Sequence, residues 1–139
     1  NDSVEDLAMT YLTTLQSIAY GTRHIVEELN AKDYKIDTLV LCGGLSKNQV
    51  FVQEMADCCQ MKVLLPKEQE AVLLGAAMLG SVASNYYESI QASMSKMGKI
   101  GKVITPRLES KSFHEKKFNV FLKMYDHWRL YESIMECER

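Results

Sequence analysis

Apolar side chains recur at steps of three and four positions along the first part of the chain. This spacing places them on one face of an amphipathic helix. Ser3 and, three positions later, Asp6 form the kind of pair that marks a helix N-terminus. We predict a helix over about residues 3–29, with His24 at the edge of its apolar face and not acting as a ligand. That face comprises Leu7, Tyr11, Leu15, Ile18, Ile25, Val26 and Leu29.

Residues 36–42 alternate between apolar and polar side chains at first and are then continuously apolar. A continuous apolar run is typical of a strand covered on both faces, as in parallel sheets, so we predict a central strand here. The strand ends at Gly43 and Gly44, and a helix follows as far as Gln60. The apolar face of this helix comprises Phe51, Val52, Met55, Ala56 and Cys59.

A second short strand is predicted at residues 62–65, because Pro66 cannot continue a central strand. A third helix is predicted from about Glu68 to residue 83, with Glu68 and Glu70 in its first turn, where the helix dipole favours anions. Gly75 in the interior of this helix costs about 1 kcal/mol relative to Ala. We therefore expect it to pack closely against the sheet or another helix. The alternation of helices and strands predicts an α/β fold.

The remainder of the chain has a different pattern. A short amphipathic helix is predicted over residues 87–97, followed by a loop through Gly98 and Gly101 that reaches Pro106. A last helix begins near Phe113 and carries an aromatic face, which is typical of a packing surface. We therefore divide the chain into an α/β core at 1–85 and a helical tail at 86–139 that packs on it.

Composition narrows the range of functions. A chain of 139 residues with 47% hydrophobic and 24% charged residues is one domain or a piece of one, and its acidic start without Met suggests a fragment. We expect no membrane helix, because no uncharged apolar run approaches the necessary length. The most basic run, residues 96–117, is interpreted as a solvated connection and not a nucleic-acid surface. The adjacent Cys58 and Cys59 are expected to be buried thiols. A reducing, cytoplasmic location is the simplest one for the four cysteines, none of which has metal-ligand spacing: Cys42, Cys58, Cys59 and Cys137.

The chemistry of the chain is concentrated where the first strand meets its helix. Paired glycines let a backbone approach a flat ligand or a phosphate, and Gly43 and Gly44 stand at the carboxyl end of a strand, where α/β proteins bind ligands. Ser46 is expected to cap the following helix, and Asn48 adds an amide that suits a heterocycle edge or a ribose. Neither GxGxxG nor GxxxxGK[ST] is present. Taken alone, the pattern is weak evidence for a ligand site and is more often that of a tight strand-to-helix turn.

A wider set of residues resembles the carboxyl-terminal domain of the FGGY family of carbohydrate kinases. The resemblance lies in residues 11–24, 41–48, 56–57 and 70–77, in order and at the family's spacing, and residues 97–106 look like the ribulokinase-type subgroup. It implies an actin-like, ribonuclease-H-like ATPase fold. It also implies ATP binding by Gly43, Gly44, Ser46 and Asn48, with Gly44 and Asn48 nearest the adenine and ribose and Ser46 fixing the turn.

The same resemblance implies a kinase that transfers phosphate from ATP, with Mg²⁺, to a ketopentose such as D-ribulose. The catalytic base, the Mg²⁺ ligands and the sugar site then lie outside this chain, in an N-terminal kinase domain, so we assign no catalytic or metal residue. No nucleic acid or membrane partner is expected. Two alternatives remain: a non-catalytic truncated isoform or interaction module, and a Rossmann-type oxidoreductase fragment, which the missing glycine fingerprint disfavours.

Overall fold

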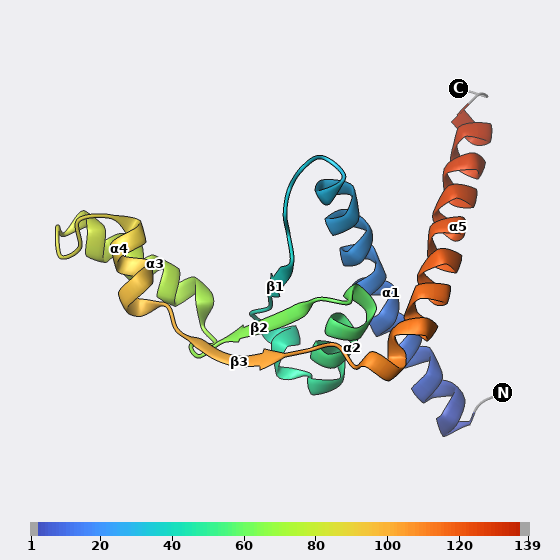
Figure 1. Ribbon diagram of the computed structural model, residues 1–139, viewed down its shortest axis with the longest axis horizontal. Helices are drawn as coiled ribbons and strands as arrows, with labels where there is room; N and C mark the ends of the chain where they lie inside the picture. The colour runs from blue at the N-terminus through green and yellow to red at the C-terminus, as the bar shows by residue number, and fades with distance from the viewer. Residues whose placement is uncertain (1–2, 137–139) are drawn as a thin grey trace. The chain divides into compact units, whose positions relative to one another are not determined.

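The computed structural model describes residues 3–136 of the chain (Figure 1). Helices and short strands alternate in its first part, as the sequence predicts. Two 3₁₀ helices, η1 (Gly44–Lys47) and η2 (Leu108–Ser110), join longer elements. The helices and strands are α1 (Val4–Asn30), β1 (Thr38–Val40), α2 (Gln49–Cys59), β2 (Lys62–Pro66), α3 (Ala71–Ala83), α4 (Ile90–Met97), β3 (Ile100–Ile104) and α5 (Lys111–Glu136).

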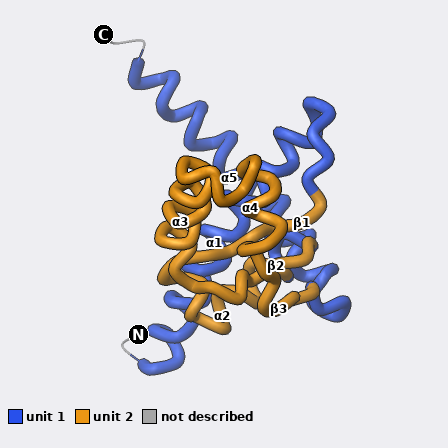
Figure 2. Tube along the Cα trace, turned by 90° about the vertical axis from the view of Figure 1, so that its left-hand side faces the viewer, with its two compact units in different colours: residues 1–36, 57–60, 106–139 blue, residues 37–56, 61–105 orange. Residues whose placement is uncertain are grey.

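The described residues form two compact units (Figure 2). The first unit takes the residues up to 36, residues 57–60 and the residues from 106 onward, so it contains α1 and α5. The second takes residues 37–56 and 61–105 and holds the sheet, α3 and α4. The predicted division into a core at 1–85 and a tail at 86–139 is based on the sequence pattern, whereas the two units are defined by contacts. The predicted division therefore stays a prediction.

Helix α1 begins as predicted, because the Ser3 hydroxyl accepts a hydrogen bond of 3.1 Å from the backbone N–H of Asp6. Its covered face is narrower than the predicted stripe. Leu7 and Ile25 are 70% and 62% exposed. The buried residues are Leu15, Gln16, Ala19, Tyr20, Arg23 and Val26.

In the first unit, α1 and α5 (Figure 1) contact each other, and aromatic rings from both helices meet there. The ring of Tyr20 lies 5.9 Å from those of Phe118 and Phe121, and its hydroxyl lies 2.8 Å from Nδ1 of His114. The guanidinium carbon of Arg23 stacks 4.1 Å from the Phe118 ring centre. The aromatic face of the last helix is thus a packing surface over this first half, as predicted.

Glu115 and Glu27 hold the charge of Arg23 in this core. Both oxygens of Glu115 accept hydrogen bonds of 3.0 Å from Arg23, and Glu27 accepts one of 2.7 Å. Burial disfavours the charged guanidinium, but the two carboxylates outweigh it, so the pKa of Arg23 is raised. A buried Arg is therefore fully compensated where α1 meets α5.

The sheet of the second unit has three strands in the order β1-β2-β3. β1 pairs with β2 in parallel, with Leu39 opposite Val63, and β2 pairs with β3 antiparallel, with Leu64 opposite Val103. The prediction of a central first strand is wrong for the described residues, because β1 pairs on one side only and Val40 is 66% exposed. The strand is also shorter than the apolar run 36–42.

Strand β3 was not expected, because residues 98–106 were predicted as a loop. It pairs with β2, and the backbone at Gly101 lies very close to the backbone at the end of β2. A Cβ added to Gly101 would lie 2.9 Å from the Cα of Lys67, so only Gly leaves room for this contact. The tail therefore contributes a strand as well as helices.

Helix α3 begins at Ala71, after the two acidic residues that were predicted in its first turn. Glu68 instead accepts a hydrogen bond of 3.1 Å from the backbone N–H of Glu70. The expected close packing at Gly75 is absent among the described residues, where nothing lies within 4 Å of an added Cβ. No residue of α3 is buried, although α3 packs on α4, where the hydroxyls of Ser81 and Ser93 lie 2.9 Å apart.

Candidate functional site

The turn between β1 and α2 is built around Gly43. Its φ of 81° and ψ of −165° fall in a backbone region that is essentially restricted to Gly. The carbonyl of Gly43 accepts a hydrogen bond of 2.6 Å from the Ser46 hydroxyl and one of 3.2 Å from the Ser46 N–H. The side chain of Ser46 therefore fixes the turn, the role that the family resemblance implied.

Asn48 holds the start of α2. Its side-chain oxygen accepts hydrogen bonds of 3.1 Å and 3.2 Å from the backbone N–H groups of Val50 and Phe51. The prediction that Ser46 caps this helix is therefore wrong. Ser46 closes the short η1 helix that intervenes, and the cap falls on the residue immediately before α2.

The space beside the two glycines is open. Among residues 3–136, and apart from the chain neighbours of each glycine, no atom lies within 4 Å of a Cβ added to Gly43 or to Gly44, and both glycines are exposed. Their backbone is thus accessible to a flat or phosphate-bearing ligand. The structure brings the four predicted residues into one turn: Gly43, Gly44, Ser46 and Asn48.

A cavity of about 390 Å³ lies next to this turn, between η1, the loop after β2, and β3. Ser46 is the one member of the predicted set that lines it. Its basic residues are Lys47, Lys67 and Lys102. Sequence reasoning missed the last two, because they come from separate segments that only the β2–β3 pairing brings together.

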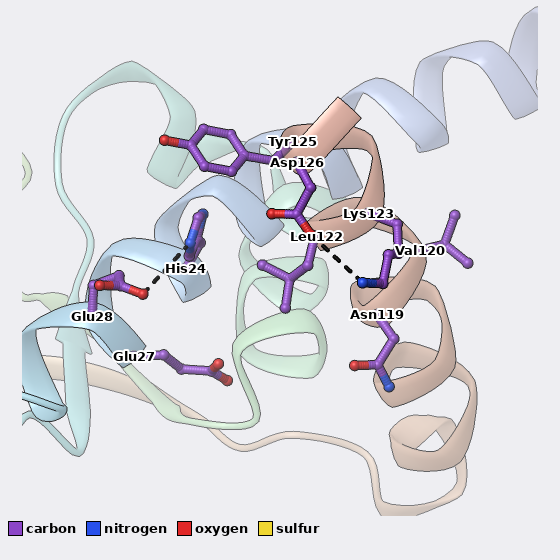
Figure 3. Close-up of a pocket in the computed structure, with 9 residues that line it drawn as sticks. All are labelled: His24, Glu27, Glu28, Asn119, Val120, Leu122, Lys123, Tyr125 and Asp126. Atoms are coloured by element: carbon purple, nitrogen blue, oxygen red, sulfur yellow. Dashed lines mark ion pairs between the residues drawn. The ribbon is translucent and has the colours of Figure 1, made fainter. Parts of the chain in front are cut away.

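A groove in the first unit is larger but less suited to a ligand (Figure 3). It has a volume of about 810 Å³ and is lined by α1 and α5. Its charges are paired within each helix, with Nε2 of His24 3.8 Å from Glu28 and Nζ of Lys123 3.6 Å from Asp126. The ring of His24 meets that of Tyr125 edge-on at 5.0 Å, which agrees with the predicted core-edge histidine.

The cysteines divide by burial. Cys58 and Cys59 are buried, as predicted, and burial raises the pKa of the Cys59 thiol to about 12. Cys42 is exposed and lines the cavity beside the turn. Cys137 lies outside the described residues.

The comparison with protein families identifies the family of the domain that contains the turn. The carboxyl-terminal domain of the FGGY family of carbohydrate kinases matches residues 2–84, a range that includes the turn, α2 and α3. This chain belongs to the FGGY family. The resemblance inferred from short runs of residues is thereby confirmed.

The FGGY relatives include longer proteins. The chain is 50% identical over 135 residues to the FGGY carbohydrate kinase domain-containing protein of Homo sapiens, a match that covers 97% of this chain and 24% of that protein. It is 30% identical over 124 residues to the ribulokinase of Halalkalibacterium halodurans, which covers 85% of this chain and 22% of that enzyme. The chain thus spans about a quarter of the length of these relatives.

A solved FGGY structure shares the fold. The chain superposes on the glycerol kinase of Plasmodium falciparum with ADP at a TM-score of 0.65 and 25% identity, which covers 81% of this chain and 22% of that one. The fold is that of part of an actin-like ATPase domain, as the resemblance implied. No helix among residues 3–136 has the length and apolarity that a membrane span needs.

Proposed function

We propose that this chain is the nucleotide-binding, carboxyl-terminal part of an ATP-dependent kinase that phosphorylates a ketopentose such as D-ribulose. The match of residues 2–84 to the FGGY family carries the proposal, because it places the open glycine turn in a kinase domain. The relative named ribulokinase supports the sugar class, and the glycerol kinase solved with ADP supports the nucleotide.

The turn has the features that adenosine recognition needs. Gly43 and Gly44 leave their backbone uncovered, so the flat adenine can lie against them. Asn48 stands at the end of η1, and its amide is assigned to the adenine or ribose, while Ser46 keeps the Gly43 carbonyl in place. Bound ATP supplies the phosphoryl group for transfer, and Mg²⁺ offsets its charge.

The remaining parts of the reaction are assigned to the rest of the protein. We place the catalytic base, the Mg²⁺ ligands and the sugar site in an N-terminal kinase domain, since no acidic residue of this chain matches a family catalytic motif. The relatives, about four times as long, have room for such a domain. This chain then contributes the nucleotide's position and not the proton transfer.

Two substitutions at Asn48 test the nucleotide role in the full protein. Asn48→Ser keeps a capping oxygen and removes the amide, whereas Asn48→Ala removes both. We expect both to raise the KM for ATP about tenfold, equivalent to about 1.4 kcal/mol, with little change in the KM for the sugar. Only Asn48→Ala should also lower the unfolding free energy, by about 1 kcal/mol. An unchanged KM for ATP in both variants would contradict the assignment.

A second candidate is a non-catalytic module that uses the same fold to bind a partner. It is favoured by the exposed apolar side chains on the second half of α5, where Trp128 and Tyr131 are 53% and 61% exposed. Purified residues 1–139 with ATP, Mg²⁺ and D-ribulose should show no phosphoryl transfer under either proposal. Turnover by this piece would show that the catalytic groups lie within it.

A further inference from the structure

The cavity beside the glycine turn is lined by positively charged side chains and by no negatively charged ones. Its ionisable ammonium groups come from Lys47 in η1, Lys67 after β2 and Lys102 in β3, and no carboxylate side chain lines it. Two amides, those of Gln49 and Gln69, complete its polar wall. We call this site the lysine cavity.

Backbone geometry holds two of these lysines near each other. The N–H of Lys67 donates a hydrogen bond of 2.8 Å to the carbonyl of Lys99, and Lys102 pairs with Leu65 across the sheet. Gly101, between these contacts, leaves no space for a side chain against Lys67. Both lysine side chains are exposed, so water screens part of the repulsion between them, and an anion held between them would be attracted by both charges.

The chain itself does not supply that anion. Among residues 3–136, no carboxylate forms an ion pair with Lys47, Lys67 or Lys102, although the whole chain carries 18 acidic residues against 16 basic ones. The one hydrogen bond that their ammonium groups make within this range is a long one, 3.5 Å from Nζ of Lys102 to Oε1 of Gln49. Within residues 3–136, the three lysines that line the cavity therefore have no carboxylate partner.

We propose that the lysine cavity binds a phosphoryl group of a small ligand. A phosphate monoester brings about −1.5 to −2 charges and three acceptor oxygens, which match a wall of N–H donors. The volume of about 390 Å³ lies within the usual range for small-molecule sites. The ligand is either a nucleotide or a phosphorylated sugar. The proposal goes beyond the proposed function, because the wall binds phosphate whether or not the glycine turn binds adenosine.

Calorimetric titration of the full protein tests the site with tripolyphosphate, ADP, ribose 5-phosphate and adenosine as probes. The double variant Lys67→Gln/Lys102→Gln should raise the Kd for tripolyphosphate at least tenfold. Lys96→Gln is the matched control, because Lys96 is exposed on α4 and outside the cavity, and it should change the Kd less than twofold. An equal loss in both variants, or none in the double variant with its melting temperature retained, would overturn the proposal.

Cys42 provides a second, local readout. It lines the lysine cavity and is exposed, whereas Cys58 and Cys59 are buried and serve as internal references. Alkylation of Cys42 by neutral iodoacetamide, followed by mass spectrometry of its peptide, should slow severalfold with tripolyphosphate but not in the double variant. Equal rates with and without tripolyphosphate in the unsubstituted protein would count against the site.

The probes also distinguish a nucleotide from a sugar phosphate as the ligand, and the cavity proposal from the proposed nucleotide role of the turn. Protection of Cys42 by ADP but not by ribose 5-phosphate assigns the phosphoryl group to a nucleotide, and the reverse assigns it to a sugar phosphate. Protection by tripolyphosphate together with a failure to bind adenosine or ADP would support the cavity and contradict the nucleotide role of the turn. Protection by adenosine equal to that by ADP, unchanged in the double variant, would overturn the cavity proposal alone.

Discussion

At the scale of single residues, the contact between Asp57 and Arg107 is the clearest stabilising feature of the first unit. Asp57 is fully buried in α2. Its carboxylate accepts hydrogen bonds of 2.6 Å from the backbone N–H and 2.7 Å from Nε of Arg107, and Nη2 of Arg107 lies 2.6 Å away. The backbone donor persists in any variant, so the side chain's contribution can be separated from it.

Arg107→Ala should lower the unfolding free energy by about 2–3 kcal/mol, because hydrogen bonds to a charged group contribute roughly 1.5–3 kcal/mol. Urea denaturation of the chain measures the change. Arg129→Ala on α5, an exposed position, is the control and should shift the value by less than about 0.5 kcal/mol. A loss no larger than that of the control would mean that the Arg107 side chain does not hold Asp57.

The Cys59 thiol gives stability an alkaline limit. Burial raises its folded pKa from 9.0 to about 12, so between these values the unfolded chain releases a proton that the folded chain keeps. Stability is therefore fully present below pH 9 and falls as the pH rises toward 12. From pH 8 to pH 10 the chain should lose about 1.4 kcal/mol more than Cys59→Ala does. Parallel slopes in urea denaturation would contradict this.

At the scale of elements, local patterns predicted helices better than strands. α1, α2 and α5 follow apolar periodicities that the sequence contains. β3 could not be predicted, because its strand state depends on pairing with β2 and on the close approach at Gly101, both non-local. The apolar run 36–42 likewise did not distinguish a central strand from an edge strand, because the apolar character of a strand does not determine how many strands pair with it.

The candidate site divides in the same way. The glycine turn is contiguous in sequence, so Gly43, Gly44, Ser46 and Asn48 could be named together before the structure was known. Which of Ser46 and Asn48 caps α2 depends on where η1 ends and α2 begins. The sequence pattern did not predict η1, so it placed the start of the helix a few residues too early. Lys67 and Lys102 come close together only because β2 pairs with β3, so no local sequence motif predicted that they share a site.

The two glycines of the turn should respond differently to the same substitution. Gly43→Ala should lower the unfolding free energy by about 1–3 kcal/mol, because its φ of 81° is strained for a residue with a Cβ. Gly44→Ala has a favourable φ and open space, so its stability should stay within about 0.5 kcal/mol of the unsubstituted chain. Thermal unfolding measures both, and equal losses would contradict the turn geometry.

Under the proposed function, Gly44→Ala should still weaken nucleotide binding, since the new methyl group occupies space assigned to the ligand. Titration of the full protein with ADP measures the effect. A Kd unchanged by Gly44→Ala would place the nucleotide away from this glycine while leaving the stability prediction untouched.

At the scale of the whole molecule, the chain leaves much apolar surface uncovered. Val72 and Leu79 on α3 are 86% and 65% exposed, and their spacing of seven residues places them on one face. Large exposed apolar surfaces are rare on isolated soluble proteins. Since the chain spans about a quarter of its relatives' length, this surface bears on how the piece behaves alone.

The isolated chain of 139 residues should therefore bind the dye ANS and associate as its concentration rises. Val72→Gln/Leu79→Gln should reduce both effects at least twofold, because it removes the apolar side chains from that face. Dye fluorescence and analytical ultracentrifugation measure the change. Equal dye binding in the variant would indicate that the apolar surface responsible lies elsewhere.

The burial of α2 also has a consequence for hydrogen exchange. Apart from the partly covered Gln53, every residue from Phe51 to Cys59 is buried, and Asn48 closes the helix start, whereas no residue of α3 is buried. Amide protons in covered, capped segments exchange only through rare large openings. Deuterium should therefore enter α3 within the shortest labelling times and reach the middle of α2 last. The amides of α2 should show the slowest hydrogen exchange in the chain.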